Sequence, residues 1–217
     1  MGVVNPRWSP DGKLIAFTDI DDKRTVGLFG FHRIYVISAD GGSPILLLAG
    51  RVGDPTWSPD GQLIAYDFNA QGIDSEVRIL DLQTQKSSTV AGSRGFWSPR
   101  WSPDGKYLAA LRSNVPKLAL FKFATQKWET LPGGVFGWPA WSHDSNFVYV
   151  VNRERNSLVR FNVADHRMEQ IASLQGFRST AYLNWWLGWF GLTPDDRPIT
   201  TRDTGIEEIY GFDLEYE

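Results

Sequence analysis

The chain has 217 residues, of which 42% are hydrophobic and 22% are charged, which is the balance of a soluble globular protein. Its formal net charge is −3 and no run of Lys or Arg forms a basic stripe, so nucleic-acid binding is not expected. The lack of cysteine excludes disulfides and a cysteine nucleophile, and no apolar stretch reaches the ~18–20 residues of a membrane-spanning helix.

The first residues, Met1–Asn5, contain neither the basic nor the apolar segment of a secretory signal peptide. We therefore expect a soluble chain that is cytoplasmic as given, while the periplasm stays open for a longer parent protein. No cofactor or metal is predicted, because His32, His143 and His166 stand far apart and no phosphate-binding glycine loop is present.

One short pattern recurs from the N-terminus onward. Four copies combine a Pro, a Trp two residues later and a Ser-x-Asp turn, and a fifth copy is degenerate. The copies occupy Asn5–Gly12, Asp54–Gly61, Ser98–Gly105, Trp138–Ser145 and Phe190–Asp196. The Trp position falls at residues 8, 57, 101, 141 and 192, where the last copy has Leu, so the spacings are 49, 44, 40 and 51 residues. A period of this length without a helical pattern is typical of a propeller or a solenoid.

Each repeat is predicted to form four strands. The motif is a hairpin with a Pro-Asp-Gly turn in its best copies, since Pro presets φ, Asp bonds nearby backbone and Gly accepts positive φ. The second strands are Leu14–Phe17, Leu63–Tyr66, Tyr107–Ala110 and Phe147–Val150. The third strands are Arg33–Ile37, Val77–Leu82, Leu118–Phe123, Leu158–Val163 and Glu208–Leu214. The fourth strands are Ile45–Leu48, Ser88–Val90, Trp128–Leu131 and Met168–Ala172.

The predicted fold is an all-β propeller of about five four-stranded blades, in a single domain over residues 1–217. The predicted blades are residues 5–50, 51–93, 94–134, 135–178 and 179–217. The motif Trp is expected on or beside the innermost strand, packed between neighbouring blades. Because only four outer strands are found, the last blade lacks its own and the ring is incomplete. Either the chain is the C-terminal part of a longer protein, which we favour, or its open edge self-associates.

The repeat Trp-Ser-Pro-Asp-Gly-Lys-x-Ile/Leu-Ala resembles that of bacterial TolB-type, WD-like propellers, in four good copies over most of the chain. The second half also resembles the C-terminal propeller of bacterial, often acidobacterial, winged-helix regulators or serine/threonine kinase proteins. The residues that carry this second resemblance are Phe96–Trp101, Phe123–Trp128, Ala172–Arg178, Gly191–Asp196 and Arg202–Tyr210. The resemblance implies a sensory or interaction module, a natural C-terminus at Glu217 and missing sequence before Met1.

Several candidate catalytic and metal patterns are better explained as structure. Ser142-His143-Asp144 has the residue types of a catalytic triad, but three consecutive side chains cannot align as nucleophile, base and orienting group. An acidic loop at Asp19, Asp21 and Asp22 lacks the Gly and the closing Glu of an EF-type calcium loop. The motif Asp residues are interpreted as turn formers rather than as sialidase-type boxes: Asp11, Asp60, Asp104, Asp144 and Asp195.

The segment Tyr182–Phe190 is the one place where the chain exceeds its repeat, and it contains three tryptophans. Trp185 and Trp186, with Trp189 beside them, are the candidate ligand or partner residues, forming a stacking surface for a sugar or a peptide. The alternative is that these rings plug the central channel or fill the gap left by the degenerate fifth motif.

The sequence predicts a non-enzymatic interaction or sensory module that binds a protein or peptide partner through loops on a rigid frame. The partner is a separate protein or an upstream domain of a longer bacterial signalling protein. The alternative hypothesis is a propeller that binds a small ligand or a carbohydrate on the Trp185–Trp186 surface, and cleaves it if paired acids lie nearby. The acids considered for that role are Asp195, Asp196 and Asp203.

Overall fold

The computed structural model describes residues 2–20, 32–69, 75–177 and 190–202. Within these ranges the chain forms β-strands and no helix, so the described part holds no helix able to cross a membrane. The first sheet has the strand order β1-β2-β3-β4 and the second β5-β6-β7-β8, both antiparallel. The bounds are β1 Gly2–Trp8, β2 Leu14–Ile20, β3 His32–Ser38, β4 Ile45–Gly50, β5 Val52–Trp57, β6 Leu63–Phe68, β7 Glu76–Asp81 and β8 Ser87–Thr89.

The second half of the chain repeats this pattern. The third and fourth sheets have the orders β9-β10-β11-β12 and β13-β14-β15-β16, and a fifth sheet pairs β17 with β18. All of these pairings are antiparallel. The bounds are β9 Phe96–Trp101, β10 Tyr107–Arg112, β11 Leu118–Lys122, β12 Lys127–Thr130, β13 Phe136–Trp141, β14 Phe147–Asn152, β15 Ser157–Asn162, β16 Met168–Ser173, β17 Phe190–Leu192 and β18 Pro198–Thr200.

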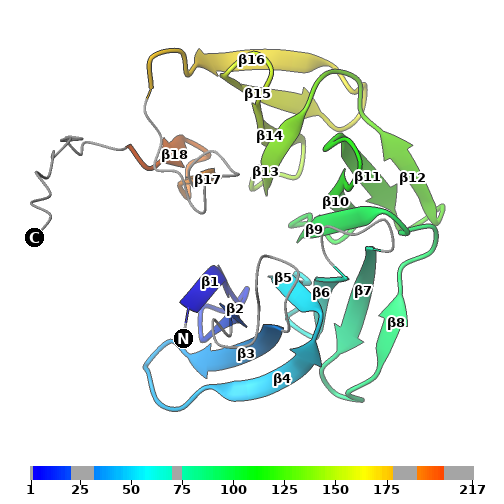
Figure 1. Cartoon of the computed structure of the whole chain (residues 1–217), viewed down its shortest axis with the longest axis vertical. Helices are drawn as coiled ribbons and strands as arrows, with labels where there is room; N and C mark the ends of the chain where they lie inside the picture. Colours follow the sequence, from blue (N-terminus) through cyan, green and yellow to red (C-terminus); the bar gives the residue numbers. More distant parts are fainter. Residues whose placement is uncertain (1, 21–31, 70–74, 178–189, 203–217) are drawn as a thin grey trace, which may run out of the picture.

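The sheets follow one another around an arc, and the first strand of each sheet lies on the inner side (Figure 1). This arrangement confirms the predicted all-β propeller with four-stranded blades. The arc is open between the first sheet and β17–β18 in the described part of the chain, which fits the predicted incomplete ring. The third strand predicted for the last blade, residues 208–214, lies outside the described residues.

The turn of each motif is closed by its own side chains. The hydroxyl at the Ser position donates to the Asp carboxylate two residues later at 2.6–2.7 Å. The same oxygen accepts a backbone N–H at or next to the start of the following strand at 2.9 Å. The pairs are Ser9–Asp11, Ser58–Asp60, Ser102–Asp104, Ser142–Asp144 and Thr193–Asp195. The five Asp residues are therefore turn formers, as predicted, and Thr193 preserves the turn in the degenerate copy.

The innermost strand of each four-stranded sheet is irregular at the residue before the motif Pro. That residue has a left-handed backbone in every copy: Asn5 (φ 54°), Asp54 (φ 46°), Ser98 (φ 54°) and Trp138 (φ 55°). The pairing with the second strand shifts register at the same place, for example between Gly53 and Thr56. Because a Pro has no N–H for a ladder hydrogen bond, a bulge is where a strand tolerates it. The recurring Pro therefore fixes a bend in each inner strand.

Neighbouring sheets pack through apolar side chains and through the motif Trp. Ala16 and Val36 of the first sheet pack with Trp57 and Ile64 of the second. The Trp57 indole Nε1–H donates to the backbone oxygen of Arg7 in the preceding sheet at 3.0 Å. Across the next-but-one interface, the Trp141 indole donates to the backbone oxygen of Arg100 at 2.9 Å. The prediction that the motif Trp lies on the innermost strand and packs between blades is confirmed at these interfaces.

Successive motif turns also contact one another. A Cβ added to Gly61, at φ +70°, would lie 3.7 Å from the Pro10 ring of the preceding turn. Gly105 stands in the same relation to Pro59, also at 3.7 Å. The turns of the first three blades therefore pack against one another in a row.

Candidate interaction surface and inner polar cluster

The predicted aromatic site cannot be placed on the fold. Trp185, Trp186 and Trp189 lie outside the described residues, so ligand binding at this segment stays a prediction. The described residue that follows them, Phe190, is buried and packs with Tyr149, Val151 and Leu158 of the fourth sheet. The degenerate fifth motif therefore still places an aromatic ring in the interface with the blade before it.

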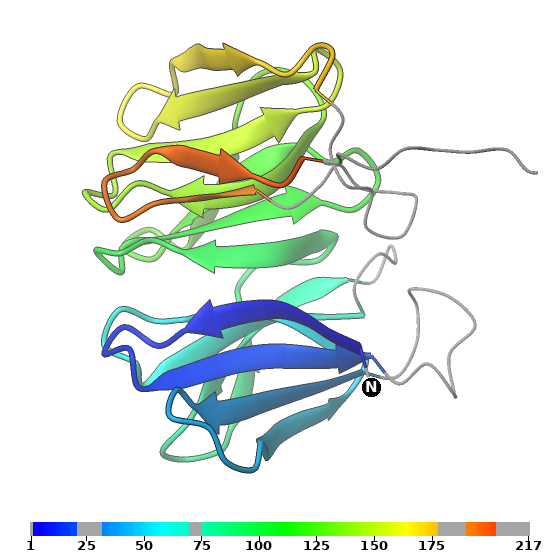
Figure 2. The same ribbon diagram turned by 90° about the vertical axis from the view of Figure 1, so that its left-hand side faces the viewer.

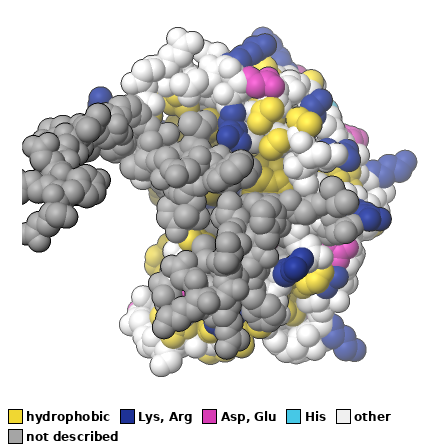
Figure 3. All heavy atoms as spheres, in the orientation of Figure 1, with side chains coloured by type: hydrophobic (Ala, Val, Ile, Leu, Met, Phe, Trp, Pro, Cys, Tyr) yellow, Lys and Arg dark blue, Asp and Glu magenta, His cyan; other side chains and the backbone are white. Residues whose placement is uncertain are grey.

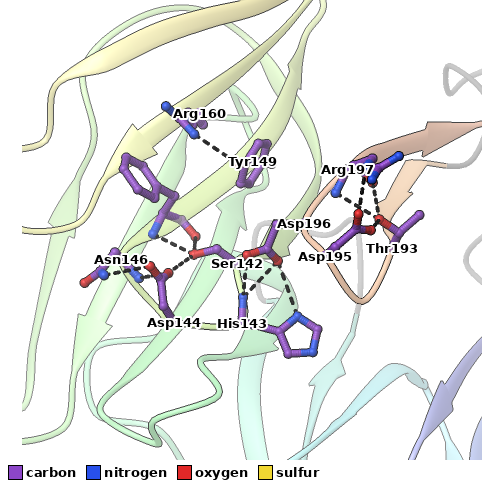
Figure 4. Close-up of polar contacts among 11 residues, drawn as sticks. Ser142, His143, Asp144, Asn146, Tyr149, Arg160, Thr193, Asp195, Asp196 and Arg197 are labelled. Carbon is purple, nitrogen blue, oxygen red and sulfur yellow. Dashed lines mark hydrogen bonds and ion pairs between the residues drawn. The ribbon is translucent and has the colours of Figure 1, made fainter.

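The triad-like sequence Ser142-His143-Asp144 forms a turn (Figure 4). The Ser142 hydroxyl donates to Asp144 at 2.7 Å and accepts the N–H of Phe147 at 2.9 Å. The His143 ring nitrogen Nδ1 lies 3.3 Å from Asp196 in the next blade instead of facing the serine. Because the histidine is turned away from the hydroxyl, the three side chains do not form the relay that nucleophilic catalysis needs.

His143 and Asp196 occupy the positions at which other turns have Pro and Gly. The Asp196 carboxylate accepts the His143 backbone N–H at 3.0 Å. At the preceding interface, Ser145 replaces the turn glycine, and its hydroxyl accepts the Asp104 N–H at 3.0 Å. Where the Pro–Gly contact between turns is lost, a polar contact across the same interface replaces it.

A buried polar cluster joins the inner strands of the first three sheets. Arg100 on β9 places Nη1 2.8 Å from Oδ1 of Asp54 on β5 and donates from Nη2 to Oδ2 at 3.0 Å. The Ser98 hydroxyl donates to the same carboxylate at 2.6 Å. Arg7 on β1 lies 3.7 Å from it, and the Ser98 N–H donates to Asp67 on β6 at 3.3 Å. One carboxylate thus ties three successive blades together.

The two carboxyl groups of this cluster have opposite pKa shifts. Burial alone would raise the pKa of Asp54, but the charges of Arg100 and Arg7 outweigh it and hold the pKa below its usual value. Burial, followed by the negative charge of Asp54, raises the pKa of Asp67 to about 7. Burial, followed by the charge of Arg100, lowers the pKa of Arg7 to about 10. Asp54 is therefore ionised at neutral pH, while Asp67 gains or loses its proton near pH 7.

Sequence reasoning missed this cluster, although its signal is present in the repeat. The first and third copies both read Pro-Arg-Trp, and the second has Asp before its Pro. Once the motif is placed on adjacent inner strands, an Asp in one blade flanked by an Arg in each neighbouring blade predicts an ion pair across the blades. The cluster is a structural tie, because Asp54, Ser98 and Arg100 are buried and bond to one another.

The first sheet has a face that no described element covers (Figure 2). Side chains alternate along a strand, and Ala16 faces the second sheet, so the adjacent Ile15 faces away from it. The pairing of β1, β2, β3 and β4 aligns further apolar residues with Ile15 in rows across this side. We call this surface the open face and define it by Val3, Trp8, Ile15, Phe17, Tyr35, Ile37 and Leu46. Within it, Phe17 is buried and stacks on Tyr35, whereas Val3, Trp8 and Leu46 are exposed.

Exposed apolar side chains are concentrated on the first sheet. Of the eight large hydrophobic residues exposed in the described part, five belong to β1, β2 or β4. These five are Val3, Trp8, Leu14, Ile45 and Leu46. The other three stand singly on later blades. In the view of Figure 3, basic side chains are scattered over the arc. By the strand register, Val3, Trp8 and Leu46 lie on the open face, whereas Leu14 and Ile45 lie on the other side of the sheet. The open face, with these three exposed side chains, is the candidate interaction surface of the described chain.

No protein-family profile and no curated protein matches the chain. Solved structures do match it. TolB from Acinetobacter baumannii superposes with a TM-score of 0.73 at 19% identity, over 94% of this chain and 49% of that one. A putative TolB from Agrobacterium tumefaciens gives 0.63 at 18% identity, over 76% and 63% of the two chains. A puromycin-hydrolyzing peptidase from Mycobacterium tuberculosis gives 0.64 at 17% identity, over 92% and 33%.

These similarities extend over most of this chain but only part of each matched protein. The chain spans about half the length of the Acinetobacter TolB structure. The matched structures include both TolB proteins and an enzyme, and a shared fold does not by itself carry an activity. From its repeats, its antiparallel blades and these superpositions, the chain has the fold of a TolB-like β-propeller.

Proposed function

We propose that the chain is a non-enzymatic interaction module, part of a longer bacterial signalling protein, that binds a protein or peptide partner or an upstream domain through its open face. The observation that carries this proposal is the exposure of Val3, Trp8 and Leu46 on one face of the first sheet. Trp8 is 62% exposed, whereas Trp57 at the same motif position is 7% exposed. Contiguous apolar surface of this kind is typical of a contact site for another protein.

The non-enzymatic part of the proposal is supported by how the motif residues are used. The hydroxyl groups at the Ser positions all bond within their own turns, and His143 bonds to Asp196. The buried charges at Asp54 and Arg100 neutralise each other. These groups have structural roles. The open face is the apolar surface of the described chain that another protein could cover.

Site-specific photo-crosslinking tests the proposal. A benzophenone amino acid is placed at position 8, on the open face, or at position 115 as a control, since Val115 is 47% exposed on a different blade. The longer protein is then irradiated in the cells that make it. We expect a defined adduct from position 8, identified by mass spectrometry, and none from position 115.

Two outcomes contradict the proposal. One is the absence of any adduct specific to position 8, which would mean that the open face has no partner. The other is turnover of aminoacyl or peptidyl amide substrates by the purified chain, which would mean that the module is an enzyme.

A further inference from the structure

The motifs of the second to fifth blades each contact the blade before them. The Trp57 and Trp141 indoles each donate to the backbone oxygen of the residue that precedes the motif Trp of the earlier blade. The turn glycines Gly61 and Gly105 lie against the Pro of the earlier turn. The Trp101 indole instead donates to the Gly105 oxygen of its own turn. The interface between blades has a direction, since the later blade presents its motif turn, and in two cases its Trp indole, to the earlier blade.

The first blade presents the same groups, but nothing in the described chain meets them. Trp8 is exposed, and a Cβ added to Gly12 would meet no atom within 4 Å. The difference in exposure between the first blade and the next three is also clear at the position five residues before the motif Trp. Val3 is 54% exposed at this position, whereas its counterparts in the next three blades are between 0% and 4% exposed: Val52, Phe96 and Phe136.

We propose that a further blade of the same repeat packs against the open face. Its position relative to the first sheet would match that of the first sheet relative to the second. This inference rests on the proposed function and specifies the chemistry of the partner. The Trp8 indole donates to the backbone oxygen before the motif Trp of the incoming blade, and Gly12 packs against the Pro of its turn. Val3 becomes buried in the interface.

The number of blades decides between a further blade and a second copy of the chain. Two five-bladed arcs joined head to tail would make a ring of about ten blades, beyond the roughly four to eight of propellers. One to three added blades keep the ring within that range. The matched Acinetobacter TolB structure is also about twice as long as the part that this chain covers. We therefore assign the incoming blade to the same polypeptide.

A blade copied from the chain itself provides the test. Residues 94–134, which contain the third sheet, are duplicated and joined directly before Gly2. This junction keeps the motif Trp positions 40 residues apart, as between Trp101 and Trp141. Because the chain has no cysteine, a single Val3→Cys substitution reports on the open face through its rate of thiol labelling. Val115→Cys, at a similarly exposed position on another blade, is the control.

We expect Val3→Cys to react freely in the original chain, which light scattering should show to be a monomer, and about tenfold more slowly when the blade is added. Val115→Cys should react at the same rate in both. An unchanged labelling rate of Val3→Cys after the blade is added would overturn the inference of a further blade. The proposed function would stand, since a different partner could still bind the open face. Slow labelling in a monomer before the addition would overturn the proposed function as well. A dimer in which Val3→Cys is shielded would identify a second copy as the occupant and overturn the assignment to a further blade.

Discussion

The carboxyl of Asp67 links protonation to folding. It is buried beside the ionised carboxylate of Asp54, with Arg100 also near, and its pKa is raised to about 7 by burial and by that neighbouring charge. In the unfolded chain an Asp titrates near its usual value of about 3.9. Between these values the folded state binds more protons than the unfolded state. The stability that this group contributes is therefore complete below about pH 4 and is lost as the pH rises to about 7.

Asp67→Asn should remove this pH dependence. The amide is neutral at every pH and its oxygen can still accept the Ser98 N–H. The difference in free energy of unfolding between the variant and the wild type should therefore change with pH. We expect it to be roughly 1–3 kcal/mol more in favour of the variant at pH 8 than at pH 5. Urea unfolding at both pH values measures the difference, with the exposed Asp40→Asn as the control. An equal difference at pH 5 and pH 8 would refute the assigned protonation.

Ser142→Ala separates a structural hydroxyl from a catalytic one. Ser142 is buried and makes two hydrogen bonds in its turn, so the variant should lose about 1–2 kcal/mol of stability. The exposed Ser88→Ala should change stability by less than about 0.5 kcal/mol. A serine-directed fluorophosphonate should not label the wild type. Covalent labelling that disappears in Ser142→Ala would show instead that the residue is a nucleophile.

At the scale of the blade, the same substitution should have unequal effects in two copies of the motif. Trp57 is buried and donates to Arg7, so Trp57→Phe should cost about 1–3 kcal/mol in free energy of unfolding. Trp8 is exposed, and Trp8→Phe should cost less than about 0.5 kcal/mol. Denaturant unfolding of the two variants measures both costs. Equal losses would mean that Trp8 is covered within the chain.

Strands and turns could be predicted from the repeat because their signals are local. An apolar run such as Leu63–Tyr66 identifies a strand, and the Ser-x-Asp turn before it identifies a hairpin. Observed strands differ from predicted ones by one to three residues at their ends, as at β7, Glu76–Asp81, and β2, Leu14–Ile20. Such ends are set by ladder hydrogen bonds that the sequence pattern does not show. The bulge before each Pro was not predicted, although its signal, a Pro inside an inner strand, is present in every copy.

At the scale of the whole molecule, the repeat period predicted the propeller and its open arc, but not the polar cluster or the open face. Both depend on which blades are adjacent and on how their inner strands are aligned. Asp54 is 46 residues from Arg100 along the chain, and Trp8 begins the same Trp-Ser-Pro-Asp-Gly sequence as the buried Trp57. Only the three-dimensional arrangement distinguishes a Trp between two blades from a Trp at the end of the arc.

The central claim is that the first blade presents an uncovered face, and hydroxyl-radical footprinting of the unaltered chain tests it most directly. Mass spectrometry compares the oxidation rates of Trp8 and Trp57, which have the same position in their motifs, within one sample. The account predicts that Trp8 is oxidised several times faster than Trp57, because their exposed fractions are 62% and 7%. Equally slow oxidation of both would contradict it, since the open face would then already be occupied.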